Sequence, residues 1–248
     1  MIFIDKVRFA GDVTVIILFF VVSLSYQSML KLSQLFSRSN RQNMSADMDL
    51  LKKIASNALK KVPNGETIEI QSLWKENTAV LCFIRRFGCP VCQYLARQIS
   101  KLRPILDKHD VKLIGIGPEE LGSKEFYEAK HLDGDVYYDP EKMCYKALGY
   151  NKYNMFNVLG GALSSKTREL ANLASKEGLK GNFSGDLMQM GGVLVVKKGG
   201  EEILFNFKQQ SAADHVENEK ILQALGIQEK IEKSEDSGPS CNADACTL

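Results

Sequence analysis

The sequence lacks an excess of charge of either sign, and it contains no internal repeat. Its 248 residues include 32 Lys and Arg against 30 Asp and Glu, which gives a formal net charge of +2. Because the two signs are nearly balanced, the chain lacks the strongly basic surface with which proteins bind nucleic-acid phosphates. Hydrophobic residues make up 44% and charged residues 25%, as in ordinary globular proteins. We therefore expect one folded domain with extensions and no nucleic-acid partner.

Cysteines are also few, and only one pair of them is closely spaced. Six cysteines in a chain of this length do not form a disulfide scaffold, and Cys89 and Cys92 alone have C-x-x-C spacing. A structural zinc site usually needs two such pairs or a pair of histidines. The three histidines show no paired spacing, so the sequence predicts no metal site. The remaining cysteines are assigned to packing or to a polar tail: Cys82, Cys144, Cys241 and Cys246.

An uncharged apolar segment precedes the main body of the chain. Residues 13–30 contain no charged side chain and are near the minimum length that spans a bilayer. Three interpretations stay open: a membrane anchor, a cleaved signal peptide, or a stretch upstream of a translation start at Met44. We accordingly divide the chain into an apolar extension over residues 1–43, a domain over 44–228 and a tail over 229–248. The tail is charged and then rich in Ser and Gly, so we expect it to be disordered.

Hydrophobic periodicity predicts strands and helices in alternation through the domain. Continuous apolar runs predict buried strands at Thr78–Ile84 and Val111–Ile116,. Apolar residues at helical spacing predict a helix that begins near Cys89 and is kinked or ended by Pro104. Asp139-Pro140 predicts an N-cap and a first helical residue. The other expected elements are a helix from Ala46, a hairpin strand at 66–70, a helix from Ser123 to about Lys130, a strand at 136–138, a helix at 167–176, strands at 193–196 and 203–207, and a helix at 217–225.

This order of elements is typical of an α/β fold with a central mixed sheet flanked by helices. The first half supplies a parallel core, and an antiparallel hairpin with a final helix closes the sheet. The segment from Gly149 to Asp186 fits the alternation poorly, and we interpret it as an insertion before that hairpin. Gly115-Ile116-Gly117 fails as a dinucleotide fingerprint because Glu120 replaces its third glycine,. A C-x-x-C at the first strand–helix junction indicates a thioredoxin-like fold.

The position of Cys89 at a helix start decides its expected chemistry. The thiolate is the nucleophilic form of cysteine, and free N–H groups at a helix N-terminus favour negative charge. Arg85 and Arg86 precede Cys89 and add positive potential. Cys92 lies one turn later, within reach for a disulfide. We predict that Cys89 attacks a peroxide oxygen or a disulfide, that Cys92 resolves the intermediate, and that an outside dithiol restores the pair.

Several separate blocks of sequence carry a family resemblance. They read RRFGCPVC at 85–92, GIGPE at 115–119, YYD at 137–139, GNFSGDL at 181–187 and GGVLVV at 191–196. These blocks resemble the prostamide/prostaglandin F synthases, a peroxiredoxin-like (AhpC/TSA) family of the thioredoxin superfamily. The resemblance runs from about Met44 to Ile227, which is most of the chain.

The resemblance implies a cytosolic oxidoreductase that reduces prostaglandin H-type endoperoxides to prostaglandin F and prostamide F. It implies no tightly bound cofactor, with electrons that come from NADPH through thioredoxin or a similar dithiol. It carries over Cys89 as the attacking cysteine and Cys92 as the resolving one. A membrane location is the alternative if residues 13–30 form an anchor. The glycosylation sequon Asn182-Phe183-Ser184 is relevant only if the domain reaches the secretory lumen,.

The chain also departs from the patterns of neighbouring families. Thioredoxins place a cis-proline before the strand that faces the C-x-x-C, whereas Met190 stands there and residues 141–238 contain no proline. Ordinary peroxiredoxins carry Thr or Ser three residues before the reactive cysteine, where this chain has Arg86. These departures weaken the case for a thioredoxin-type disulfide exchanger and for simple peroxide reduction. A general thiol peroxidase and a non-catalytic redox-sensing protein remain the alternative functions.

Overall fold

Seven strands form one mixed sheet at the centre of the domain. The structure is a computed structural model that describes residues 45–150, 152, 164–182 and 184–229. The strands are β1 (Ala58–Lys61), β2 (Thr67–Glu69), β3 (Thr78–Phe83), β4 (Val111–Gly117), β5 (Asp135–Tyr138), β6 (Gly192–Val196) and β7 (Ile203–Lys208). Their order across the sheet is β2-β1-β5-β4-β3-β6-β7. Strands β3, β4 and β5 run parallel, and the remaining neighbours pair antiparallel.

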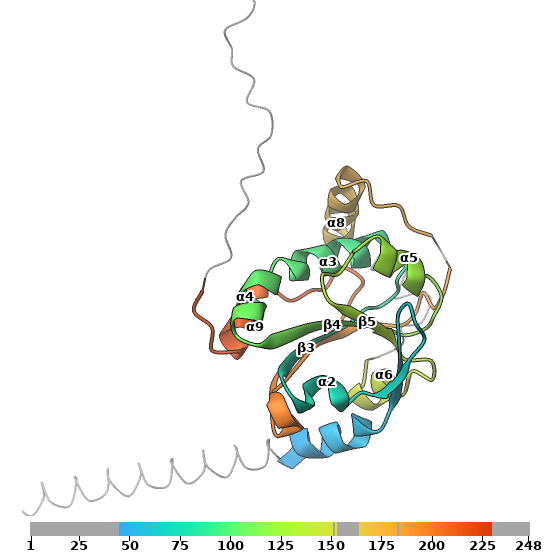
Figure 1. Cartoon of the computed structure of the whole chain (residues 1–248). Coiled ribbons are helices and arrows are strands. Elements are labelled where there is room, and N and C mark those ends of the chain that lie inside the picture. Colours follow the sequence, from blue (N-terminus) through green and yellow to red (C-terminus); the bar gives the residue numbers. More distant parts are fainter. Residues whose placement is uncertain (1–44, 151, 153–163, 183, 230–248) are drawn as a thin grey trace, which may run out of the picture. The chain divides into compact units, whose positions relative to one another are not determined.

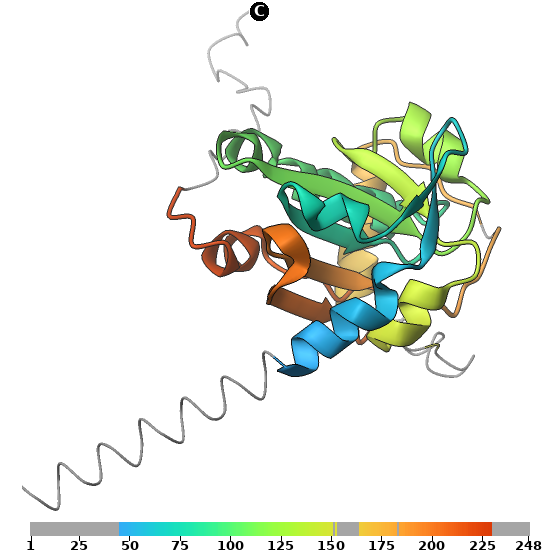
Figure 2. The same ribbon diagram turned by 60° about the horizontal axis from the view of Figure 1, so that its bottom comes forward.

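Helices cover both faces of this sheet (Figure 1). One face carries α3 (Pro90–Ser100), α4 (Arg103–Lys108), α5 (Ser123–Glu128), α8 (Ser165–Lys176) and α9 (Asn218–Ala224). The other face carries α2 (Ser72–Lys75), α6 (Met143–Leu148) and, through Leu51 and Ile54, the helix over residues 45–55. In the turned view, α9 lies beside the β6–β7 hairpin (Figure 2). The mixed sheet with flanking helices confirms the thioredoxin-like fold that the sequence predicts.

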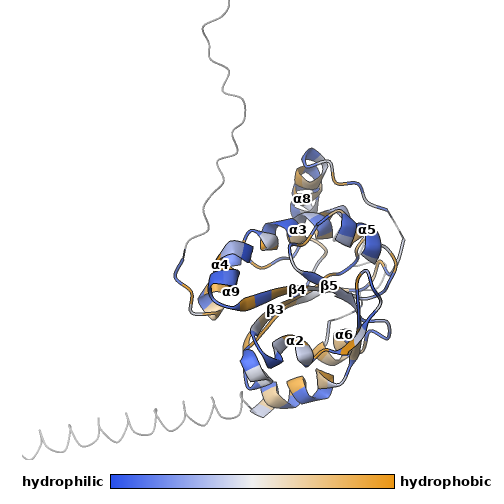
Figure 3. Cartoon of the chain, in the orientation of Figure 1, coloured by the Kyte–Doolittle hydropathy of each residue, from blue (hydrophilic) through white to orange (hydrophobic). Residues whose placement is uncertain are grey.

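Strand β3 shows how the sequence builds two cores at once. Successive side chains of a strand point to opposite faces, so Val80 and Cys82 pack under α3 and α4, whereas Leu81 and Phe83 pack under α2 and α6. All four are buried. Burial of an aliphatic side chain of this size contributes roughly 1.5–3 kcal/mol. Figure 3 shows apolar residues on the central strands and polar ones on α5 and α8.

Tyr145 is hydrogen-bonded to the carboxyl ends of β3 and β4. Its hydroxyl reaches the carbonyl oxygens of Ile84 (2.8 Å) and Ile116 (2.7 Å) from beneath the sheet. The ring of Tyr145 also packs edge-on against Phe83 at 5.3 Å. A fully buried tyrosine with a partnered hydroxyl holds this edge rigidly. The carboxyl ends of the parallel strands are therefore a firm platform for the segments that follow them.

One prediction about helix boundaries is wrong. Asp139-Pro140 does not open a helix, because α6 begins at Met143. The carboxylate of Asp139 instead accepts hydrogen bonds from the backbone N–H groups of Met143 (3.1 Å) and Cys144 (2.8 Å). The residue thus caps the helix across an intervening turn. Pro104 behaves as predicted, since α3 ends at Ser100 and Pro104 lies in the first turn of α4.

Two elements were not anticipated, and some predictions lie outside the described residues. Strand β1 and the single turn α2 carry no strong periodicity, although each buries one large residue, Leu59 or Trp74. None of the helices in the described ranges is long and apolar enough to cross a membrane. The described residues do not include the segment 13–30 or the tail from 230 onward. They also leave out residues 151, 153–163 and 183 of the predicted insertion.

Candidate active site

The cysteine pair lies where the chain leaves β3 and enters α3. Cys89 is the N-cap of α3, with extended backbone angles, and Pro90 is the first helical residue. The backbone N–H of Cys92 donates to Sγ of Cys89 over 3.4 Å. Both cysteines are free thiols, and Cys89 is 5% exposed. A proline without an N–H costs nothing in this first turn, so the local sequence is well suited to presenting Cys89 at the helix N-terminus.

Arg85 is the cation that contacts the Cys89 sulfur. Its Nη2 donates to Sγ of Cys89 over 3.2 Å, and its Nη1 donates to the carbonyl oxygen of Leu187 over 3.3 Å. The side chain is buried, with 8% of the residue exposed. None of the ion pairs among the described residues includes Arg85. A buried guanidinium without a carboxylate needs another anion, and the thiolate of Cys89 supplies it.

Arg86 is turned away from the sulfur and holds a different segment. Its Nη1 donates to the backbone carbonyl oxygens of Asn182 and Ser184. The sequence had grouped the two arginines together as neighbours of the thiolate. The structure separates them, because only Arg85 forms a hydrogen bond with Cys89, whereas Arg86 contributes positive charge from further away.

These contacts push the pKa values of the two cysteines apart. The hydrogen bond from the Cys92 thiol holds the pKa of Cys89 well below its usual range, with further help from the charge of Arg85, the Cys92 N–H and the charge of Arg86. Burial of Cys89 acts in the opposite direction. The pKa of Cys92 is raised well above its usual range by its hydrogen bond to Cys89 and by burial. Near neutral pH the pair therefore contains one thiolate, on Cys89, and one thiol.

The two other cysteines of the sheet and its helices are chemically inert. Burial raises the pKa of Cys82 to about 12, and burial together with the charge of Asp139 raises the pKa of Cys144 to about 12. Thiols with such values do not ionise near neutral pH. The structure thus agrees with the assignment of both residues to packing.

A segment far along the chain covers the start of α3. The backbone N–H of Asn182 donates to the carbonyl oxygen of Gly88 over 2.9 Å. Gly181 packs so closely that a Cβ atom there would lie 2.2 Å from Cδ of Pro90. No larger residue fits at this position without displacing the covering segment. The GNFSGDL block and the RRFGCPVC block therefore pack against each other.

Charged side chains bind this covering segment at its C-terminal end, around Asp186. The carboxylate of Asp186 lies 2.8 Å from Nζ of Lys142 and 2.9 Å from Nζ of Lys152. Oε1 of Glu119 accepts a hydrogen bond from the backbone N–H of Asp186 over 2.8 Å. The GIGPE block thereby joins the same cluster. The end of the predicted insertion over residues 149–186 therefore returns to the start of α3. In the sequence, the separate matching blocks are the only sign of this contact.

Two hollows flank the cysteine pair. One is an apolar hollow of about 60 Å³ whose wall includes Cys92, Leu95, Val193 and Val216. The other is a more polar hollow of about 380 Å³ beside Phe87 and Gly88. The polar hollow contains two buried side-chain atoms without hydrogen-bond partners, Oε1 of Gln93 and Nδ1 of His131. In the described ranges, no three His, Cys, Asp or Glu side chains gather into a site able to hold a metal ion.

The fold and the cysteine pair define the broad class of the protein. Residues 98–211 match the family described as AhpC/TSA antioxidant enzyme. Among solved structures, the bacterioferritin comigratory protein of Xanthomonas campestris has a TM-score of 0.50 at 12% identity over 71% of this chain and 93% of that one. A peroxiredoxin Q variant from the same organism has a TM-score of 0.50 at 13% identity over 71% and 93%. The protein thus has a peroxiredoxin-like fold.

Comparison of sequences narrows this class to one family. The chain is 49% identical over 197 residues to the prostamide/prostaglandin F synthase of Danio rerio, covering 79% of this chain and 97% of that protein. It is 45% identical over 202 residues to the synthase of Xenopus tropicalis, with 82% and 99% covered. The synthase of Homo sapiens is 42% identical over 194 residues, with 78% and 97% covered. The chain belongs to the prostamide/prostaglandin F synthase family, which confirms the resemblance.

Proposed function

We propose that this protein reduces prostaglandin H-type endoperoxides to F-type products, with Cys89 as the attacking cysteine and Cys92 as the resolving one. The observation that carries the proposal is the hydrogen bond from Arg85 to a buried Cys89 sulfur whose pKa is lowered. The names of the relatives supply the substrate class, both the free prostaglandin and its ethanolamide. A stabilised thiolate is the group that a strained O–O bond requires as its nucleophile.

The first step consumes the O–O bond. The Cys89 thiolate attacks one endoperoxide oxygen, so that an S–O bond forms and the O–O bond breaks. The second oxygen leaves as an alkoxide and takes a proton to become a hydroxyl group. Arg85 stabilises the thiolate before attack, and its buried positive charge also favours the oxyanion that develops close by.

The second step releases the product. Cys92 loses its proton and attacks the Cys89 sulfur, so that an S–S bond forms and the S–O bond breaks. The released oxygen takes a proton and becomes the second hydroxyl group of an F-type product. The pair has then supplied two electrons and is a disulfide, while the two hydroxyl protons come one from the Cys92 thiol and one from solvent. The backbone N–H of Cys92 donates to the Cys89 sulfur over 3.4 Å, and this closeness supports the proposed attack,.

An external dithiol must return the pair to its reduced form. We propose thioredoxin or a similar protein for this role, with NADPH as the ultimate electron donor and the cytosol as the location. A C-x-x-C disulfide is reduced by thiol–disulfide exchange with another dithiol, which supports this route. Glycan on Asn182 in protein purified from its native cells would contradict a cytosolic location.

The decisive experiment is NADPH consumption with thioredoxin, thioredoxin reductase and a prostaglandin H-type endoperoxide. We expect turnover that yields an F-type product, and we expect Cys89→Ser to abolish it. Cys144→Ser is the matched control and should retain turnover. Activity on hydrogen peroxide but not on the endoperoxide would identify a general thiol peroxidase, and inactivity on both would identify a redox-sensing protein.

A further inference from the structure

An apolar hollow lies behind Cys92 beside α3. Its inner wall includes Cys92, Ala96 and Val193, and its polar lining is small. A second, larger hollow of about 450 Å³ shares Leu95, His215 and Val216 with it. Because the two hollows share these lining residues, they lie next to each other on one side of α3, and we call them together the groove.

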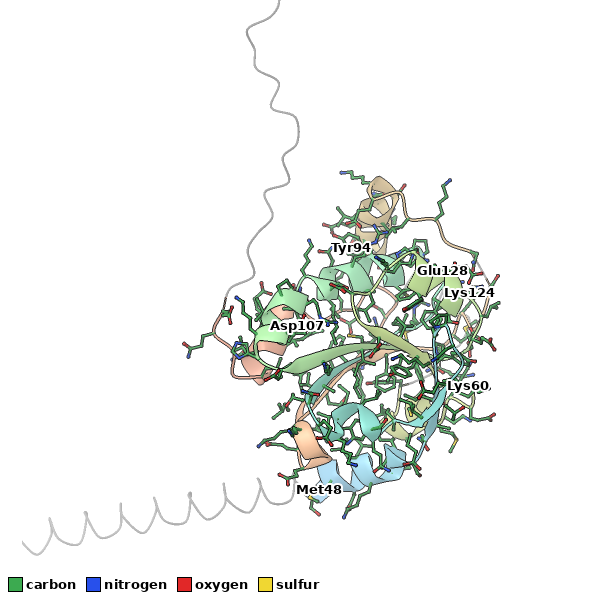
Figure 4. All side chains as sticks on the ribbon, in the orientation of Figure 1. Met48, Lys60, Tyr94, Asp107, Lys124 and Glu128 are labelled. Atoms are coloured by element: carbon green, nitrogen blue, oxygen red, sulfur yellow. The ribbon has the colours of Figure 1, made fainter. Side chains whose placement is uncertain are left out.

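Half-buried apolar side chains accompany the groove over its length. Leu95, Ile99 and Phe207 line its inner part and are only partly covered. Leu173 of α8 and Tyr94 of α3 line its outer part. Figure 4 shows Tyr94 on α3 on the side of α8. Surface of this kind beside a reactive pair is typical of a site for an apolar ligand.

The outer end of the groove is acidic. Glu169, Glu217 and Glu219 line it, against a single cation, Lys166. A carboxylate would meet three negative charges and one positive charge there, so a ligand that ends in a carboxylate is disfavoured. An uncharged alkyl chain meets no such penalty.

We propose that this groove binds the uncharged alkyl chain of the lipid endoperoxide, the chain that does not carry the head group. The inner end of the groove contains Cys92 and Arg85, the two residues whose groups donate to the Cys89 sulfur. An alkyl chain attached to a ring at that sulfur would therefore reach the groove past Cys92 and Arg85. The head group then lies elsewhere, so the groove serves free prostaglandin and ethanolamide substrates alike. This inference rests on the proposed endoperoxide reduction.

The test is a substitution that fills the groove. Ala96 is buried in its wall, and Ala96→Leu places extra methyl groups where the alkyl chain would lie. Each methylene removed from an apolar site weakens binding about fourfold, so displacement of two methylenes should raise KM roughly tenfold or more. We expect this increase for both the acid and the ethanolamide, with kcat little changed. The alkylation of Cys89 by iodoacetamide, which has no long chain, should be unaffected.

Ala129→Leu is the matched control, because the same change fills the polar hollow instead. It should leave KM for both lipids unchanged. An increase in KM with Ala129→Leu and none with Ala96→Leu would overturn the proposal. If Ala96→Leu slows alkylation of Cys89, the variant has damaged the cysteine pair. Val216→Phe, which fills the groove from another wall, then replaces it in the KM measurements.

A binding measurement separates this inference from the proposed function. Calorimetry with the unreactive F-type acid and its ethanolamide needs no turnover. We expect Ala96→Leu to weaken both, and to have no effect on an analogue whose uncharged chain is shortened by four carbons. Equal binding of all ligands by wild type and variant would overturn the groove even if the enzyme turns over. Absence of turnover with intact, groove-dependent binding would instead overturn the proposed reaction alone.

Discussion

Nη2 of Arg85 donates to Sγ of Cys89 over 3.2 Å, four residues away along the chain. We expect Arg85→Met to raise the pKa of Cys89, because hydrogen bonds to charged groups contribute about 1.5–3 kcal/mol. The midpoint of iodoacetamide alkylation against pH should then move upward by roughly one to two pH units. Arg86→Met is the control and should move the midpoint less, since Arg86 binds the carbonyl oxygens of Asn182 and Ser184. Equal shifts in both variants would refute a special role for Arg85.

Selective alkylation is a second expected outcome. Burial raises the pKa of Cys82 and Cys144 to about 12, so at neutral pH only Cys89 should react at an appreciable rate. The measurement is peptide mapping by mass spectrometry in a background with Cys241→Ser and Cys246→Ser. Early modification of Cys144 would show that its thiol ionises near neutral pH, contrary to this prediction.

The close approach of Gly181 to Pro90 gives a third prediction. A Cβ at residue 181 would lie 2.2 Å from Cδ of Pro90 and 2.8 Å from the carbonyl oxygen of Gly88. Gly181→Ala should therefore displace the covering segment and lower the free energy of unfolding by about 1–3 kcal/mol. Urea unfolding checks the stability, and the alkylation midpoint of Cys89 reports the local damage. Lys180→Ala, at an exposed neighbouring position, should change neither quantity appreciably.

Sequence patterns predicted the parallel core because β3 and β4 are continuous apolar runs whose two faces are both buried,. They predicted the position of Cys89 because apolar residues at helical spacing follow it and Pro90 is tolerated in a first helical turn,. They failed at Asp139, because its carboxylate caps α6 from a turn rather than from the adjacent position. They also failed at residues 181–186, whose contacts with Gly88 and Glu119 depend on tertiary packing and carry no periodic signal.

Exposed ion pairs contribute little to the fold by comparison with these buried contacts. Lys124 and Glu128 project outward from α5 (Figure 4), with 4.0 Å between Nζ and Oε1. Both side chains are well exposed, and such pairs contribute at most about 1 kcal/mol. The cluster around Asp186 is different because its carboxylate is largely buried between two lysines. We infer that the covering segment is held mainly by Asp186, by the hydrogen bonds from Arg86 and by the backbone contact at Gly88.

His131 makes stability depend on pH in a defined direction. Burial, with a smaller contribution from the charge of Arg97, lowers the pKa of His131 to about 4 from the ordinary value of 6.5. Between these two values the unfolded chain binds more protons than the folded one, so the free energy of unfolding falls as pH falls from 6.5 to 4. We expect this residue to account for a loss of roughly 2 kcal/mol.

His131→Phe keeps the ring packed near Phe126, which lies 5.2 Å away, but cannot be protonated. Urea unfolding at a series of pH values should show a flatter profile for the variant, because all other titrating groups are the same in both proteins. Parallel profiles would mean that the His131 imidazole is protonated as readily in the folded protein as in the unfolded chain.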